Sequence, residues 1–190
     1  MGGTFNPVHM GHLLLAETVR SDYPLDKILF MPAAIPPHKE QETLCSAELR
    51  LRMLELAVEP YPFLGVSDYE IQKGGVSYTI DTVRWLQSDS PYQADELFLI
   101  IGGDSLVELH TWRCPEDILN QIQTLVIARS GFDFEHVSSR YLEAVQMIET
   151  PLIDISSSQI RERVRSNRSI RFWVPDSVAG FILENGLYRS

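Results

Sequence analysis

The amino-acid sequence predicts an α/β protein with a mainly parallel sheet that is covered by helices on both faces. Short apolar or β-branched runs alternate with longer segments whose apolar residues recur at helical spacing. The longest irregular stretch, residues 32–45, directly follows one of these runs. Because open parallel sheets bind ligands at the carboxyl ends of their strands, we expect functional residues to gather in such loops.

Five runs are predicted to be strands, and a predicted helix separates each from the next. The strands are expected over residues 27–31, 63–67, 97–101, 124–128 and 145–149. Helices are expected over residues 11–22, 46–59, 78–88, 104–121 with an interruption near Pro115, and 135–144. Two more helices are expected in the tail. One covers residues 156–165 and is opened by serines, and the other covers 175–186, opened by Pro175 and Asp176 and closed by Gly186. Without a repeat or a long linker, residues 1–190 are expected to form one domain, with a C-terminal helical part over 155–190.

The charge balance excludes several classes of function. With 26 acidic and 16 basic residues, the 190-residue chain has a formal net charge of −10, which argues against broad binding to nucleic acid or anionic membranes. No apolar run reaches the roughly 20 residues of a membrane span, and no signal-peptide pattern is present. Cys45 and Cys114 lack the spacing of a zinc site or a disulfide framework. We expect a cytoplasmic protein with a local anion pocket; its oligomeric state stays open, a homo-oligomer included.

The stretch GGTFNPVHMGH, residues 2–12, has the composition of a ligand-binding turn. Gly2 and Gly3 allow a tight turn and a close approach of the backbone to a ligand. His9 and His12 lie where an apolar helix begins, so two imidazoles and unpaired backbone N–H groups meet at a helix N-terminus, a favourable place for phosphate. A metal site on the two histidines and a plain turn are the alternatives, although two histidines alone supply too few ligands for zinc.

A second phosphate site is indicated by ISSSQIRERV, residues 155–164. Serine is a good N-cap, but capping alone explains one of the hydroxyls of Ser156, Ser157 and Ser158. Clustered hydroxyls beside the guanidinium of Arg161 at a helix N-terminus suit phosphate oxygens. A serine-capped helix that happens to contain an arginine is the structural alternative.

Together the two stretches resemble the motifs of the nucleotidyltransferase superfamily. GGTFNPVHMGH is similar to the signature G-x-F-x-P-x-H-x-G-H, and ISSSQIR resembles I-S-S-T-x-I-R, found near the C-terminal end of its adenylyltransferases. The resemblance implies a Rossmann-like doubly wound sheet and transfer of AMP from ATP to an acceptor phosphate, with release of pyrophosphate. It implies no covalent enzyme intermediate and a Mg²⁺ ion bound mainly through the ATP phosphates.

The resemblance also implies roles for individual residues. His12 should contact the α-phosphate in the transition state, with His9 helping on the phosphate chain, and Arg161 should act with them. The implied ATP-binding residues are Gly2, Gly3, Thr4, Phe5, His9, His12, Gly102, Asp104, Ser156, Ser157, Ser158 and Arg161.

Three further stretches resemble bacterial nicotinate-nucleotide adenylyltransferases, which convert nicotinate mononucleotide and ATP into deamido-NAD in NAD biosynthesis. They are PAAIPPHK (32–39), SYTIDTV (77–83) and LIIGGDSLVELHTWRCPEDIL (99–119). His38 and Lys39 can supply positive charge to the acceptor phosphate. Thr79 and Arg113 lie where the nicotinate carboxylate is bound, and Trp112 can stack on the pyridine ring.

Several alternatives stay open at this stage. Asp104 could accept ribose hydroxyl groups or serve only as the N-cap of the next helix, and Trp112 could belong to the core. Nicotinamide mononucleotide and pantetheine phosphate are alternative acceptors, and a non-catalytic nucleotide-binding module is the alternative to an enzyme. The chain departs from the family in two places: Ala33 and Ala34 follow Pro32, where asparagine is common, and a strand expected before GGTF is missing, which suggests a start further upstream.

Overall fold

A computed structural model describes residues 1–37, 44–89, 97–129, 132–151 and 153–189. The chain forms two compact units. The first, called the motif part, comprises Gly3–Gly75 and Ile153–Ser190 and contains most of both sequence motifs. The second, called the central part, comprises Val76–Leu152 together with Met1–Gly2.

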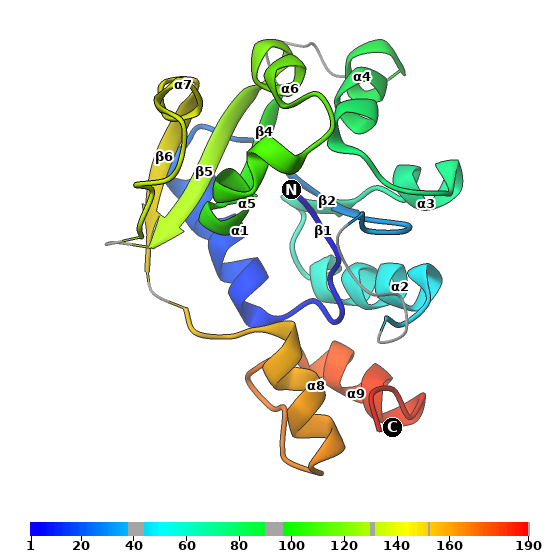
Figure 1. The fold of residues 1–190 in the computed structure, drawn as a ribbon. Coiled ribbons are helices and arrows are strands. Elements are labelled where there is room, and N and C mark those ends of the chain that lie inside the picture. The colour runs from blue at the N-terminus through cyan, green and yellow to red at the C-terminus, as the bar shows by residue number, and fades with distance from the viewer. Residues whose placement is uncertain (38–43, 90–96, 130–131, 152, 190) are drawn as a thin grey trace. The chain divides into compact units, whose positions relative to one another are not determined.

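Apart from Gly2, a three-stranded sheet in the order β1-β2-β3 belongs to the motif part. Figure 1 labels β1 and β2 of this sheet. Its strands are β1 (Gly2–Gly3), β2 (Ile28–Pro32) and β3 (Leu64–Val66). β2 and β3 run parallel, with Ile28 opposite Leu64. The helices of this part are α1 (Met10–Asp22), α2 (Ala47–Val58), α3 (Tyr69–Lys73), α8 (Ser157–Arg165) and α9 (Asp176–Glu184).

Helix α2 packs against β2, β3 and α9, and this packing buries one of its faces almost entirely. It begins at Ser46, whose hydroxyl accepts a hydrogen bond from the backbone N–H of Leu49 at 3.3 Å. The buried positions recur at helical spacing and are Arg50, Met53, Leu54, Ala57 and Val58. This face therefore belongs to the hydrophobic core, although one of its residues is the charged Arg50.

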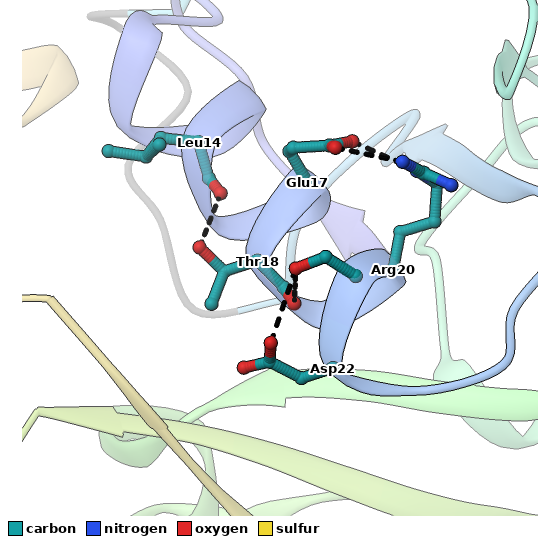
Figure 2. Close-up of polar contacts among 6 residues, drawn as sticks. Leu14, Glu17, Thr18, Arg20 and Asp22 are labelled. Atoms are coloured by element: carbon teal, nitrogen blue, oxygen red, sulfur yellow. Dashed lines mark hydrogen bonds and ion pairs between the residues drawn. The ribbon is translucent and has the colours of Figure 1, made fainter.

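Helix α1 is held by contacts near its carboxyl end (Figure 2). The Thr18 hydroxyl donates to the Leu14 carbonyl at 2.9 Å, and the Arg20 guanidinium makes two hydrogen bonds to Glu17 at 2.8 and 2.9 Å. The same guanidinium lies 4.4 Å from the centre of the Phe63 ring. The first two contacts lie within α1, and the contact with Phe63 joins this end of the helix to the residue just before β3.

The central part contains a second three-stranded sheet, in the order β4-β5-β6. Its strands are β4 (Phe98–Gly102), β5 (Gln123–Arg129) and β6 (Val145–Thr150), and both strand pairs are parallel. The helices are α4 (Thr79–Asp89), α5 (Gly103–Val107), the 3₁₀ helix η3 (Leu109–Thr111), α6 (Pro115–Gln121) and α7 (Ser139–Glu143).

Two apolar clusters form the core of the central part. One contains Ile101, Leu106, Leu109, Val126, Val137 and Tyr141, and the other contains Ile80, Val83, Ile118 and Ile122. β-Branched residues from β4 and β5 meet leucines from α5 and η3 in the first cluster, which accounts for the near-continuous apolar runs of these strands. None of the described helices combines the length and apolar character that crossing a membrane requires.

The α/β class with parallel strands and flanking helices is confirmed, and the five predicted strands are present within one residue of their expected ends. The prediction over 135–144 was too long, because Asp133 accepts the Glu135 N–H at 2.8 Å and this turn competes with helix, which begins only at Ser139. The five-residue helix α3 was missed. Its end at Gly74, with φ of 70°, could have been suspected from the Gly74–Gly75 pair.

Candidate active site

The turn before α1 is built around a buried phenylalanine. Phe5 is 3% exposed and has a left-handed backbone with φ of 49°. A Cβ atom on Gly3 would lie 2.8 Å from the Phe5 ring, so only glycine fits there. The Phe5 ring meets Phe30 of β2 and His12 of α1 edge to face, with centroids 5.6 and 5.0 Å apart. The turn is thereby fixed to both the sheet and the helix.

His9 and His12 are organised by the helix N-terminus on which they lie. His9 is the N-cap of α1, and its backbone N–H donates to Nδ1 of His12 at 3.2 Å. Since His12 Nδ1 accepts a hydrogen bond, the proton of the neutral ring lies on Nε2, which is therefore a donor. The two rings stack with centroids 3.6 Å apart, and a Cβ on Gly11 would come within 3.0 Å of His9 Nδ1. This close approach explains the glycine between the histidines.

His9 is a buried and neutral imidazole. It is 7% exposed, and burial lowers its pKa from 6.5 to about 4. Its Nδ1 atom is buried without a hydrogen-bond partner among the described residues. A buried polar nitrogen without a partner is costly, so this atom is a candidate contact for a polar ligand.

The three serines of ISSSQIR have three different partners. Ser156 caps α8, accepting from the Gln159 N–H at 3.2 Å, while the Gln159 side chain accepts from the Ser156 N–H at 2.8 Å. The Ser157 hydroxyl donates to the carbonyl of Pro7 at 2.8 Å. Ser158 accepts from Arg161 at 3.2 Å. Capping thus accounts for one hydroxyl, as expected, and another ties α8 to the histidine turn.

Arg161 joins the two motifs directly. Its Nη1 donates to the carbonyl of Asn6 at 2.9 Å, and its Nε is buried without a partner among the described residues. The motifs lie over 140 residues apart in sequence, yet Pro7 and Asn6 accept hydrogen bonds from Ser157 and Arg161. The structure therefore brings the predicted phosphate residues of the motif part together. We call this group the phosphate cluster: His9, His12, Ser156, Ser157, Ser158 and Arg161.

Three residues that sequence reasoning missed lie beside the phosphate cluster, in or against the turn that precedes α1. Asn6 and Arg50 are 3% and 1% exposed, and Tyr188 donates to the Asn6 side chain at 2.9 Å. A signal for Arg50 was present in the sequence, because it occupies a core position of the apolar stripe of α2. Tyr188 had no such signal, since it follows the predicted end of the last helix.

In the central part, Gly102 and Asp104 lie where β4 gives way to α5. Gly102 is the N-cap of α5, and Asp104 is an exposed residue of its first turn without a side-chain capping bond. The alternative in which Asp104 caps the helix is therefore wrong. Gly103 is buried, and a Cβ there would lie 3.3 Å from the Phe132 ring. The exposed carboxylate at this strand end is free of a capping duty.

The other predicted acceptor residues of the central part differ in setting. Trp112 is half-buried and packs against both apolar clusters, so it contributes to the core. Arg113 is exposed, with its guanidinium 4.9 Å from the centre of the Tyr78 ring. Thr79 is half-buried at the start of α4. His38 and Lys39 lie outside the described residues.

The phosphate cluster does not have the ligands of a protein-built magnesium site. Within the described residues, no group of three or more histidine, cysteine, aspartate or glutamate side chains is placed to hold a metal ion. The cluster offers imidazole, hydroxyl and guanidinium groups, which suit phosphate oxygens, whereas magnesium prefers carboxylate and phosphate oxygens.

The fold and the phosphate cluster define the class of protein. The model of the cytidylyltransferase-like family matches residues 1–163, and the chain belongs to this family of nucleotidyltransferases. A probable nicotinate-nucleotide adenylyltransferase of Lachnoclostridium phytofermentans is 36% identical over 195 residues, which cover 99% of this chain and 96% of the relative. One from Desulfitobacterium hafniense is 39% identical, covering 100% of this chain and 94% of the relative. Within the class, the chain belongs to the nicotinate-nucleotide adenylyltransferases.

Solved structures support the same fold. The nicotinic acid mononucleotide adenylyltransferase of Plasmodium falciparum, complexed with NaAD, superposes with a TM-score of 0.80 at 17% identity, covering 98% of this chain and 94% of that one. The same enzyme complexed with APC gives a TM-score of 0.77 at 16% identity. At such low identity these likenesses establish the fold, whereas the family rests on the sequence relatives.

Proposed function

We propose that this protein is an enzyme of NAD biosynthesis that transfers AMP from ATP to nicotinate mononucleotide, giving deamido-NAD and pyrophosphate. The observation that carries the proposal is the hydrogen bonding of Ser157 and Arg161 to the Pro7 and Asn6 carbonyls just before the two histidines. This arrangement supports a polyphosphate site made by two helix N-termini. Membership of the nicotinate-nucleotide adenylyltransferases supports the choice of acceptor.

The proposed reaction needs no nucleophile from the protein. A phosphate oxygen of nicotinate mononucleotide forms a bond to the α-phosphorus of ATP, the bond from that phosphorus to the bridging oxygen breaks, and pyrophosphate leaves. Negative charge spreads over the oxygens of the transferring group in the transition state, so positioned donors are the main requirement. We assign the donor nearest the α-phosphate to His12, whose Nε2 carries the proton of the neutral ring.

The other members of the phosphate cluster are assigned to the remaining phosphates of ATP. Arg161 provides a positive charge that is already oriented by Asn6 and Ser158. His9 is neutral at physiological pH, because burial lowers its pKa to about 4, and acts on the phosphate chain by hydrogen bonding rather than by charge. Gly2, Gly3, Thr4 and Phe5 supply the turn along which ATP is proposed to lie. We propose that Mg²⁺ binds together with ATP, through the ATP phosphates, because the phosphate cluster itself has no carboxylates.

The acceptor roles are proposals for side chains of the central part and for residues 38 and 39, which follow β2 in the sequence. Arg113 and Thr79 are proposed to bind the nicotinate carboxylate, and Trp112 is proposed to stack on the pyridine ring. Gly102 and Asp104 are proposed to bind nucleotide, with the exposed Asp104 carboxylate accepting ribose hydroxyl groups. His38 and Lys39 are proposed to bind the acceptor phosphate. Residues 1–190 are proposed to act as one domain, in the cytoplasm, where ATP is available and the unpaired Cys45 and Cys114 stay reduced.

The direct test is incubation with ATP, Mg²⁺ and one of three acceptors: nicotinate mononucleotide, nicotinamide mononucleotide or pantetheine phosphate. We expect pyrophosphate and deamido-NAD with the first acceptor and a much lower kcat/KM with the other two. Equal efficiency with the amide, or a preference for it, would refute the assigned acceptor. ATP binding without turnover on any acceptor would favour the non-catalytic module.

A further inference from the structure

Arg50 is a buried cation that ties three loops together. It is 1% exposed, and its guanidinium donates to the carbonyls of Thr4 at 2.9 Å, Ala34 at 3.0 Å and Cys45 at 3.1 Å. No carboxylate among the described residues forms an ion pair with Arg50. Burying a charge is expensive unless polar partners compensate, and an apolar side chain would fill the same core position of α2 at less cost.

Tyr188 reaches the same turn from the end of the chain. Helix α9 ends in a Schellman motif, in which the N–H of Leu187 donates to the Ile182 carbonyl at 3.0 Å and Gly186 has φ of 60°. The Tyr188 hydroxyl that follows donates to Oδ1 of Asn6 at 2.9 Å. Burial raises the pKa of Tyr188, so the hydroxyl stays protonated and remains a donor.

Asn6 connects these contacts to the phosphate cluster. Its side-chain Oδ1 accepts from Tyr188 and from the backbone N–H of Cys45, and its carbonyl accepts from Nη1 of Arg161 at 2.9 Å. Arg50 holds the carbonyl of Thr4, two residues earlier. A shift of this turn would therefore move the carbonyl that orients the Arg161 guanidinium.

We propose that Arg50 and Tyr188 are positioning residues for ATP binding, holding the Thr4–Asn6 turn and, through it, Arg161. The proposal rests on the proposed function only in taking ATP as the ligand of the phosphate cluster. Neither side chain belongs to the two sequence motifs. Through its bonds to Ala34 and Cys45, Arg50 also joins the residues just after β2 and just before α2 to this turn.

Calorimetric titration with ATP and Mg²⁺, without acceptor, tests the proposal on the variants R50K and Y188F. The matched controls are R52K on the exposed face of α2, where Arg52 pairs with Glu55 at 3.0 Å, and Y61F at an exposed tyrosine. We expect Kd to rise about tenfold in R50K and about threefold to fivefold in Y188F, as loss of one or more oriented hydrogen bonds implies, with unchanged stoichiometry. The controls should stay within about twofold of the unsubstituted protein.

A purely structural role has a different signature. It would lower the stoichiometry, because fewer molecules are folded, while Kd stays at the level of the unsubstituted protein; this result in Y188F would overturn the proposal. Should R50K fail to fold, Y188F decides alone, since it removes a single hydroxyl group. Intact ATP binding without deamido-NAD formation by the unsubstituted protein would refute the proposed function and leave the positioning roles testable. Absence of ATP binding would refute both.

Discussion

The two parts of the chain present their predicted ligand-binding residues in opposite ways. In the motif part, Arg161 and Ser157 donate hydrogen bonds to backbone carbonyls, and His12 accepts one from a backbone N–H. In the central part, Arg113 is exposed and contacts the face of an aromatic ring, and Asp104 is an exposed carboxylate without a capping bond.

This difference fits the two tasks proposed for these regions. Stabilising charge that develops on a transferring phosphorus depends on donors that are already oriented, because reorientation during the reaction costs energy. Recognition of a substrate group at the surface tolerates side chains that adjust on binding. We therefore expect substitutions in the phosphate cluster to lower kcat strongly and substitutions in the central part to act mainly on the acceptor KM.

The largest effect is expected for His12→Ala. Removal of a donor to the transition-state phosphate should lower kcat by about a hundredfold or more. The control is His136→Ala, at an exposed histidine of the central part, which should keep full activity. Steady-state assays of pyrophosphate release measure both variants. Turnover within a few-fold of the unsubstituted enzyme would show that the assigned role of His12 is wrong.

The next effect concerns the pH dependence of stability through His9. Its pKa is about 4 in the folded protein but near 6.5 when unfolded, so below about pH 6.5 the unfolded chain takes up the proton first and unfolding becomes more favourable. Lowering the pH from about 7.5 to 4 should reduce the free energy of unfolding by about 3 kcal/mol through this group alone. Urea unfolding of the unsubstituted protein and of His9→Gln should diverge by that amount over this range. Parallel curves would contradict the burial of a neutral His9.

A smaller loss is expected for Arg161→Lys, which keeps the charge and removes the planar fork. Lysine cannot bond the Asn6 carbonyl and a phosphate oxygen in the same geometry, so kcat/KM for ATP should fall about tenfold to thirtyfold. Arg165→Lys is the control on the same helix, where Arg165 lies 3.6 Å from Glu162 near the surface. An equal loss in both variants would mean that general positive charge on α8, rather than orientation, is what matters.

The sequence predicted the fold in more detail than it predicted the contacts of the phosphate cluster. Alternating apolar runs and helical periods predicted the five strands to within one residue. The signal is clearest for β2 and β5, which have a neighbour on each side, are largely buried and have near-continuous apolar sequences. The two motifs predicted the side chains that lie together in the phosphate cluster. They did not predict that Ser157 and Arg161 bond to the Pro7 and Asn6 carbonyls, since pairing between distant backbone groups has no local sequence pattern.

The site residues that the sequence analysis did not predict were missed for one physical reason. Arg50, Asn6 and Tyr188 act through backbone carbonyls or through one another, so their partners are set by tertiary structure alone. Trp112 shows the converse, because an aromatic side chain beside apolar residues has the same pattern whether it packs in a core or awaits a ligand. Its half-buried position against both clusters leaves room for either duty.

Trp112→Phe separates these two duties. The smaller ring leaves part of both apolar clusters unfilled, and we expect about 1 kcal/mol less stability in thermal or urea unfolding. The acceptor KM should rise about threefold to fivefold if the indole also stacks on the pyridine ring, because a larger ring face gives a stronger contact. Lower stability with an unchanged acceptor KM would assign Trp112 to the core alone.

The smallest effect is expected for Arg113→Met, and it is one of specificity rather than rate. The exposed guanidinium lies over the Tyr78 ring and has no ion pair among the described residues, so its removal should leave stability within about 0.5 kcal/mol. A positive charge near the acceptor favours a carboxylate over an amide, and we expect the preference for nicotinate over nicotinamide mononucleotide to fall about threefold to tenfold. Arg84→Met, which removes an exposed arginine paired with Asp117 at 3.2 Å, is the control. If both variants keep the original ratio of kcat/KM values, selectivity must come from backbone amides rather than from the Arg113 guanidinium.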